Sequence, residues 1–171
     1  MKLFSILIFL GFCLSAAATA EDSTMHSLQI TITAISRSGE ITVKLRNGSE
    51  GPIKIWRESN AWGAARWRVL RVREGQLETF FQNPNQRFTR NMPISDEIAP
   101  GRDIERKLDL NGGNWCGFRH CSSYNERGLG GREASFEPGD VIIVTYDVPR
   151  SNEASDMAVW YGVIASMATV Q

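Results

Sequence analysis

The chain has 171 residues, and 19 Lys and Arg balance 19 Asp and Glu, so its formal net charge at pH 7 is zero. This balance excludes bulk electrostatic attraction to a polyanion as the basis of function, and nucleic acid is not an expected partner. The length fits one domain with one sizeable core.

The first 20 residues have the features of a cleaved signal peptide. A single cation, Lys2, precedes an apolar block at residues 3–14, and small residues follow up to Ala20. The block is shorter than the ~20 apolar residues of a transmembrane helix, and residues 18–20 give the small-x-small pattern of a cleavage site. We expect a signal peptide at 1–20, a single domain at 21–171, and a secreted or periplasmic location. Removal of Lys2 leaves a formal charge of −1.

Alternating apolar residues predict strands from the start of the mature chain. Residues 28–34 alternate between apolar and polar side chains, and residues 40–46 repeat the pattern. Turn-forming residues at 47–52 predict a reversal, after which Ile53 and Ile55 begin a third strand.

Residues 66–73 predict another strand with an irregularity. Its apolar residues lie at odd positions up to Val69 and at even positions from Leu70, and this switch predicts a β-bulge. Shorter strands are expected at residues 77–81, 88–91 and 104–110.

Six glycines and the absence of apolar periodicity predict a long irregular loop at residues 111–132, and such loops are often functional or mobile. Residues 141–148 are apolar on both faces, which predicts a central strand, and the last strand is expected at 158–164. Residues 157–170 are too few and too polar for a membrane span, so none is expected in the mature chain.

Many short strands with Gly and Pro turns, and no helix-period stretch, predict an all-β antiparallel sandwich. Residues 95–171 add a set of turn and core signals: Ala99-Pro100-Gly101 before Leu108-Asp109-Leu110, then Glu137-Pro138-Gly139-Asp140, then Val159-Trp160-Tyr161-Gly162. In these motifs the chain resembles exported bacterial immunoglobulin-like β-sandwich proteins, a largely uncharacterised group. The resemblance implies an immunoglobulin-like antiparallel β-sandwich and carries no catalytic residue.

Two cysteines, Cys116 and Cys121, remain after cleavage, and export delivers them to a compartment where thiols are usually oxidised. We expect them to form a disulfide, which closes a short loop and stabilises the fold by at most ~2–3 kcal/mol. A zinc site at these thiols and His120 is the alternative, but it needs four ligands and the only other histidine is His26. No metal or other cofactor is therefore expected.

The sequence offers little for catalysis. Adjacent side chains such as His120 and Cys121 point apart on an extended backbone, and the chain has no Gly-x-Ser-x-Gly elbow. We expect no catalytic residues and no enzymatic activity.

Candidate binding residues lie in two segments. The first is the loop, with Trp115, His120 and Tyr124. The second is a basic aromatic segment, in which Arg66, Arg68, Trp62 and Trp67 are the first candidates. It contains five arginines and three tryptophans: Arg57, Arg66, Arg68, Arg71, Arg73, Trp56, Trp62 and Trp67. Arginine stacks on aromatic rings and forks onto carboxylate or phosphate, so this segment could form a surface for a glycan or polyanion. The alternative is structural: the arginines line the solvent face of one strand and pair with acids on neighbouring strands, and the tryptophans fill the core.

Together these features predict a non-enzymatic exported binding or structural module, whose partner is another exported protein or a glycan. The alternative is a carbohydrate- or polyanion-binding accessory domain, for which several exposed, coplanar tryptophans would be the decisive sign. An inhibitor-like or chaperone-like partner of another exported protein would instead present a protruding loop or an open strand edge. The sequence leaves the ligand and the oligomeric state open.

Overall fold

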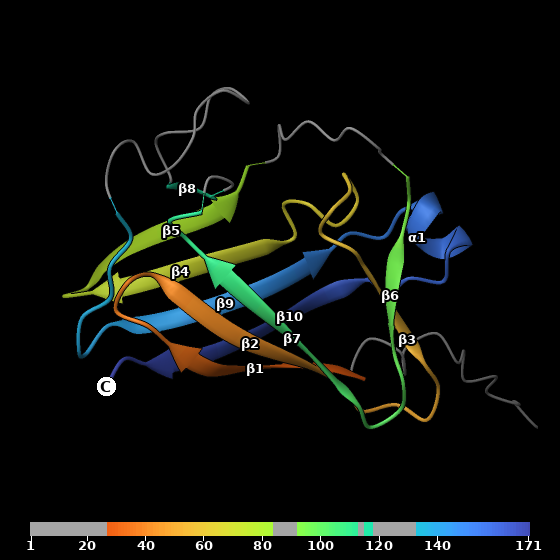
Figure 1. Ribbon diagram of the computed structural model, residues 1–171, viewed down its shortest axis with the longest axis horizontal. Coiled ribbons are helices and arrows are strands. Elements are labelled where there is room, and N and C mark those ends of the chain that lie inside the picture. Colours follow the sequence, from red (N-terminus) through yellow and green to blue (C-terminus); the bar gives the residue numbers. More distant parts are fainter. Residues whose placement is uncertain (1–26, 84–91, 113–114, 118–132) are drawn as a thin grey trace, which may run out of the picture.

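The computed structural model describes residues 27–83, 92–112, 115–117 and 133–171. This part of the chain is mostly β-strand, and every pair of neighbouring strands runs antiparallel (Figure 1). The predicted all-β class is thereby confirmed. The predicted signal peptide and the predicted strand at 88–91 lie outside the described residues.

The strands form three sheets. The first has the order β1 (Leu28–Ile35), β2 (Glu40–Asn47), β7 (Asp103–Asp109). The second has the order β10 (Gly162–Thr169), β9 (Val141–Val148), β4 (Trp67–Arg73), β5 (Gln76–Gln82), β8 (Trp115–Gly117). The third pairs β3 (Ile53–Trp56) with β6 (Ser95–Ile98), and a five-residue helix, α1 (Asn152–Asp156), precedes β10.

The core lies between the two larger sheets, which form two layers (Figure 1). Alternation along β2 buries Ile41, Val43 and Leu45 completely, as period-two patterning predicts. From the opposite layer, Val69 and Val144 are equally buried. The layers also meet at one corner, where β1 contacts β10 and the backbone N–H of Ile32 donates to Ser166 Oγ at 3.1 Å.

The predicted bulge in β4 is wrong. Residues 67–73 pair with β5 and β9 in unbroken register. The apolar parity switches because both faces of β4 carry apolar residues: Val69 is buried in the core, while Leu70 and Val72 lie half-buried on the other face. Among the described strands, the register shifts instead in β1, between Ile32 and Ala34.

The C-terminal region departs from the expected strand at 158–164. Ser151 caps α1 by accepting a hydrogen bond from the Ala154 N–H at 3.1 Å, and a helix of five residues is too short to show helical periodicity. Ala158 then has a φ of 51°, so the chain turns and the strand starts only at Gly162. The predicted central strand is confirmed, since β9 lies between β10 and β4.

Two short strands were not predicted. β6 follows the undescribed residues 84–91, and β8 lies inside the segment expected to be an irregular loop. Three or four residues are too few to establish a period, so only pairing with β3 and β5 defines these strands.

Candidate functional site

The first predicted binding segment begins in the core. Trp115 is 4% exposed, and Cys116 is fully buried. Both lie on β8, where they pair with Gln82 and Phe81 of β5. His120, Tyr124 and Cys121 lie outside the described residues, so the Cys116–Cys121 disulfide and the two remaining candidate contacts stay predictions.

The second predicted segment is divided between two faces. Trp67 is 1% exposed and belongs to the core, whereas the adjacent Arg68 is exposed on the other face of β4. Trp62 is half-buried and tilts against Trp56, with 6.1 Å between the ring centroids. The Nε of the half-buried Arg66 donates to the Trp62 carbonyl, and burial lowers the pKa of this guanidinium. These four residues therefore form no common basic aromatic surface.

The tryptophans instead build an aromatic layer of the core. Trp67 tilts against Tyr146 with 4.6 Å between centroids, and Tyr146 stacks on Trp160 at 6.0 Å. Tyr146 and Trp160 are both buried, and burial raises the pKa of the Tyr146 hydroxyl. Four of the five tryptophans are buried, as the structural interpretation of this segment predicts.

Glu58 joins this aromatic layer to a charged cluster that the sequence did not reveal. Trp67 Nε1 donates to Glu58 Oε1 at 2.8 Å, and Arg106 Nε lies 3.5 Å from the same oxygen. Arg106 also binds Asp96 at 2.7 Å, and Arg57 binds the other Asp96 oxygen through Nε and Nη2. Burial raises the pKa of Glu58, and its hydrogen bond from Trp67 and the charge of Arg106 oppose that shift.

Arg106 is the residue whose position in the sequence could have predicted this cluster. Arg106 falls between Ile104 and Leu108 on the side of β7 whose other residues are apolar. A guanidinium there needs carboxylates, and Glu58 and Asp96 come from the loop after β3 and from β6. The cluster therefore ties β7 to the two-stranded sheet.

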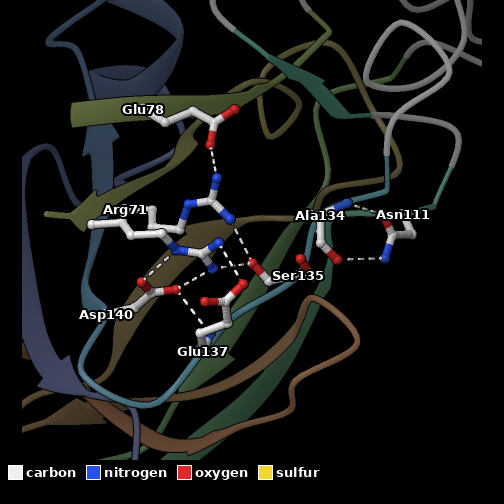
Figure 2. Close-up of polar contacts among 8 residues, drawn as sticks. Arg71, Glu78, Asn111, Ala134, Ser135, Glu137 and Asp140 are labelled. Carbon is white, nitrogen blue, oxygen red and sulfur yellow. Dashed lines mark hydrogen bonds and ion pairs between the residues drawn. The ribbon is translucent and has the colours of Figure 1, made fainter. Parts of the chain in front are cut away.

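Arg71 and Arg73 form a second charged cluster at the end of β4. Figure 2 shows Arg71 among the residues of this cluster, with Glu78, Ser135, Glu137 and Asp140. Arg73 donates from Nε and Nη2 to the two oxygens of Asp140, at 2.8 and 2.7 Å, and from Nη1 to Glu137 at 2.7 Å. Arg71 donates to Glu78 on β5 and to the Ser135 carbonyl. Arg71 therefore pairs with an acid on a neighbouring strand, as the structural interpretation predicts, whereas the acids that bind Arg73 lie in the segment before β9. The predicted solvent face is wrong for both arginines, because they lie on the same side of β4 as the buried Trp67 and Val69.

Asn111 holds the segment that leads to this cluster (Figure 2). Its Oδ1 accepts the Ala134 N–H at 2.7 Å, and its Nδ2 donates to the Ala134 carbonyl at 3.1 Å. Nδ2 also donates to the Ser38 carbonyl at 2.7 Å. Next to this contact Gly39 has a φ of +84°, and a Cβ there would lie 2.7 Å from the Ala134 oxygen, which explains why the position is glycine. These contacts fix the backbone that carries Ser135, Glu137 and Asp140.

Both charged clusters join separate elements of the fold. Among the described residues, a further apolar surface lies on the side of the five-stranded sheet that faces away from the core. We define the outer face as the apolar residues on that side: Leu70, Val72, Leu77, Phe81, Val141, Ile143, Val163 and Met167. Strand register aligns them in rows. Leu77, Val72 and Val141 form one row, and Leu70, Ile143 and Met167 form the next.

Three residues of the outer face are exposed and the other five are half-buried, and its two central rows contain threonine but no charged side chain. Leu77, Val163 and Met167 are 63, 67 and 68% exposed. Among the described residues, charged side chains enter the rows only at one end, at Arg68 and Asp147. Antiparallel sheets usually place polar residues on the side away from the core, and a contiguous apolar patch on such a side marks an interaction site.

Within the described residues, no helix combines the length and apolar character needed to cross a membrane, and no three metal-binding side chains gather into a site. The sequence matches no protein-family model and no curated protein.

Proposed function

We propose that the protein is a non-enzymatic exported binding module, with an immunoglobulin-like sandwich, that binds another exported protein through the outer face. The observation that carries this proposal is the group of apolar side chains on the outer face, of which Leu77, Val163 and Met167 are 63, 67 and 68% exposed. Full burial of one Leu, Val or Met side chain contributes ~1.5–3 kcal/mol. Burial of Leu77, Val163 and Met167 in a complex would therefore supply several kcal/mol of binding free energy.

The positions of the aromatic and basic residues favour a protein over a glycan. A glycan platform needs exposed aromatic rings, whereas Trp67, Trp115 and Trp160 are buried. A polyanion site needs several free guanidinium groups on one surface, whereas Arg66, Arg71 and Arg73 are engaged by the Trp62 carbonyl, Glu78 and Asp140. Apolar side chains on a sheet face match the buried centre of a protein interface.

Site-specific photo-crosslinking tests the proposal because it captures whichever protein lies against the labelled position. A benzophenone amino acid replaces Leu77 or Met167 in the chain expressed with residues 1–20 in place, and the exported fraction is irradiated. We expect protein adducts at both positions. The matched control carries the probe at Glu105, which is exposed on β7 of the opposite layer, and should form none. Equal adducts at Glu105, or none at the outer face, would overturn the proposal.

We further propose that export removes residues 1–20 and oxidises Cys116 with Cys121. Mass spectrometry of the intact exported protein should show an N-terminus at Glu21. A digest made without reductant should contain one peptide pair joined through Cys116 and Cys121, and that pair should separate after reduction. A retained leader or a free thiol at both cysteines would contradict these two expectations.

A further inference from the structure

We propose that the partner on the outer face is a second copy of this chain, and that two sheets pack face to face as a two-fold symmetric dimer. This inference rests on the proposed function and names its partner. It requires that the face be large enough, complementary to itself, and compatible in charge with a symmetric arrangement.

The outer face has the size of a small specific interface. Four strands, β5, β4, β9 and β10, contribute, and the rows run from Asp147 and Val163 to Val72 and Leu77. With ~4.8 Å between strands and ~3.3 Å per residue, this gives roughly 450 Å² in projection. Two copies would bury on the order of 1,000 Å², which reaches the lower limit for a specific protein–protein interface.

The face is complementary to itself. Sheets stack ~10 Å apart with their strands within ~30° of each other when both faces carry interdigitating apolar side chains. The inner faces of this fold stack in two layers through Val, Ile, Leu and Phe, and the outer face offers the same residue types with Met167. An apolar sheet face therefore fits another sheet face, and a second copy supplies one through the commonest symmetry of soluble oligomers.

Charge selects one arrangement. Arg68 lies at one end of β4, three residues before Arg71, and the exposed Glu74 follows three residues after it, in the turn to β5. If the two-fold axis crosses the strands at the level of Arg71, the two β4 strands run antiparallel. Arg68 of one copy then lies level with Glu74 of the other, and Leu70 lies opposite Val72. An axis along the strands would instead place Arg68 level with Arg68, which like-charge repulsion disfavours.

Sedimentation equilibrium of the purified exported protein, from roughly 1 to 200 µM, tests the dimer. We expect a monomer–dimer equilibrium. Leu77→Lys and Met167→Lys alter side chains that are already exposed, so both variants should fold with unchanged circular dichroism, and each should raise the dimer Kd at least tenfold. The matched control, Thr31→Lys on the exposed side of β1, should leave the Kd unchanged.

A charge exchange tests the antiparallel arrangement itself. Arg68→Glu and Glu74→Arg should each raise the dimer Kd several-fold, and the double variant should restore it. A wild-type protein that stays monomeric overturns the dimer, as does a dimer that neither lysine variant weakens. Photo-crosslinks from Leu77 or Met167 to a different protein, together with a monomer, would overturn this inference and leave the proposed function standing.

Discussion

Arg73 on β4 holds both carboxylate oxygens of Asp140, a residue 67 positions later that lies just before β9. Asp140 is 2% exposed and also accepts the Glu137 N–H at 2.9 Å. The fork of the guanidinium and the two oxygens of the carboxylate make a planar, bidentate contact. This pair ties the segment before β9 to the neighbouring strand of the same sheet.

The pair predicts a specific loss of stability in acid. The hydrogen bonds from Arg73 hold the pKa of Asp140 below its usual range. A lowered folded-state pKa stabilises the fold fully above the ordinary value of about 3.9, and this stabilisation is lost as the pH falls through the folded-state pKa. Asp140→Asn should therefore be less stable than wild type at neutral pH, and the difference should shrink below about pH 4.

Urea unfolding between about pH 2 and pH 7 measures this difference, and Glu50→Gln at an exposed turn is the control that should follow wild type throughout. An Asp140→Asn protein whose deficit stays constant down to the lowest pH would contradict the assigned role.

The contribution of Glu58 to stability should change with pH in the opposite direction to that of Asp140. Burial raises its pKa, so the folded state binds a proton more readily than the unfolded chain, and its contribution to stability decreases as the pH rises through the raised pKa. Glu58→Gln keeps an oxygen acceptor for Trp67 Nε1 and should remove this decrease above about pH 4.3. Glu58→Ala also removes the acceptor and should cost about 1–3 kcal/mol.

Urea unfolding of both variants, followed by tryptophan fluorescence, separates the two effects of Glu58. If the alanine and glutamine variants are equally stable, the hydrogen bond to Trp67 contributes nothing to the fold.

Two leucines provide a matched pair for the assignment of core and outer face. Leu108 is 1% exposed and Leu77 is 63% exposed. Leu108→Ala should lower the free energy of unfolding by about 2–5 kcal/mol, because it leaves a cavity between the layers. Leu77→Ala should change it by less than about 0.5 kcal/mol when measured well below the dimer Kd. Comparable losses at both positions would show that the outer face is buried within one chain.

Asn111 should control the protection of one backbone amide. Its Oδ1 is the acceptor for the Ala134 N–H, and Ala134 is buried. Asn111→Ala should therefore increase hydrogen exchange at Ala134 and cost about 1–2 kcal/mol, whereas Asn111→Asp retains the acceptor and should keep most of the protection. Exchange measured by NMR at Ala134 distinguishes them, with the Val144 amide in β9 as the internal reference. Equal protection in all three proteins would contradict the role of Asn111.

The buried tryptophans predict the result of a glycan titration. Trp62 is the most accessible of the five, and it is half-buried against Trp56. Intrinsic fluorescence should therefore stay constant when cell-wall fragments or heparin are added at about millimolar concentration. A saturable shift that Trp62→Ala abolishes in a folded protein would instead support the carbohydrate alternative.

The period-two pattern determined most of the fold, because each strand that is half-buried must alternate. The buried residues of β2 and the doubly apolar β9 were readable for this reason. The same rule gave a wrong prediction at β4. The apolar residues Leu70 and Val72 indicated that a bulge turns the strand over, whereas the register of β4 is unbroken. Alternation reports which residues are apolar, and it does not report how many faces of a strand are covered.

The structural interpretation of the arginines was also accessible from the sequence, because a basic strand in a neutral chain needs acidic neighbours. The sequence did not indicate which acidic residues these neighbours are. Asp140 meets Arg73, and Glu58 meets Trp67, only because strands distant in sequence become adjacent in a sheet or across layers.

By itself the sequence determined the strand-rich class, the core alternation and the candidate residues, since these follow from local side-chain chemistry. Tertiary structure alone decided which tryptophans are hidden, which charges are paired, and that Leu77, Val163 and Met167 share one exposed face. The physical reason is strand order: burial and pairing depend on neighbours that the chain brings together only when β10, β9, β4 and β5 align.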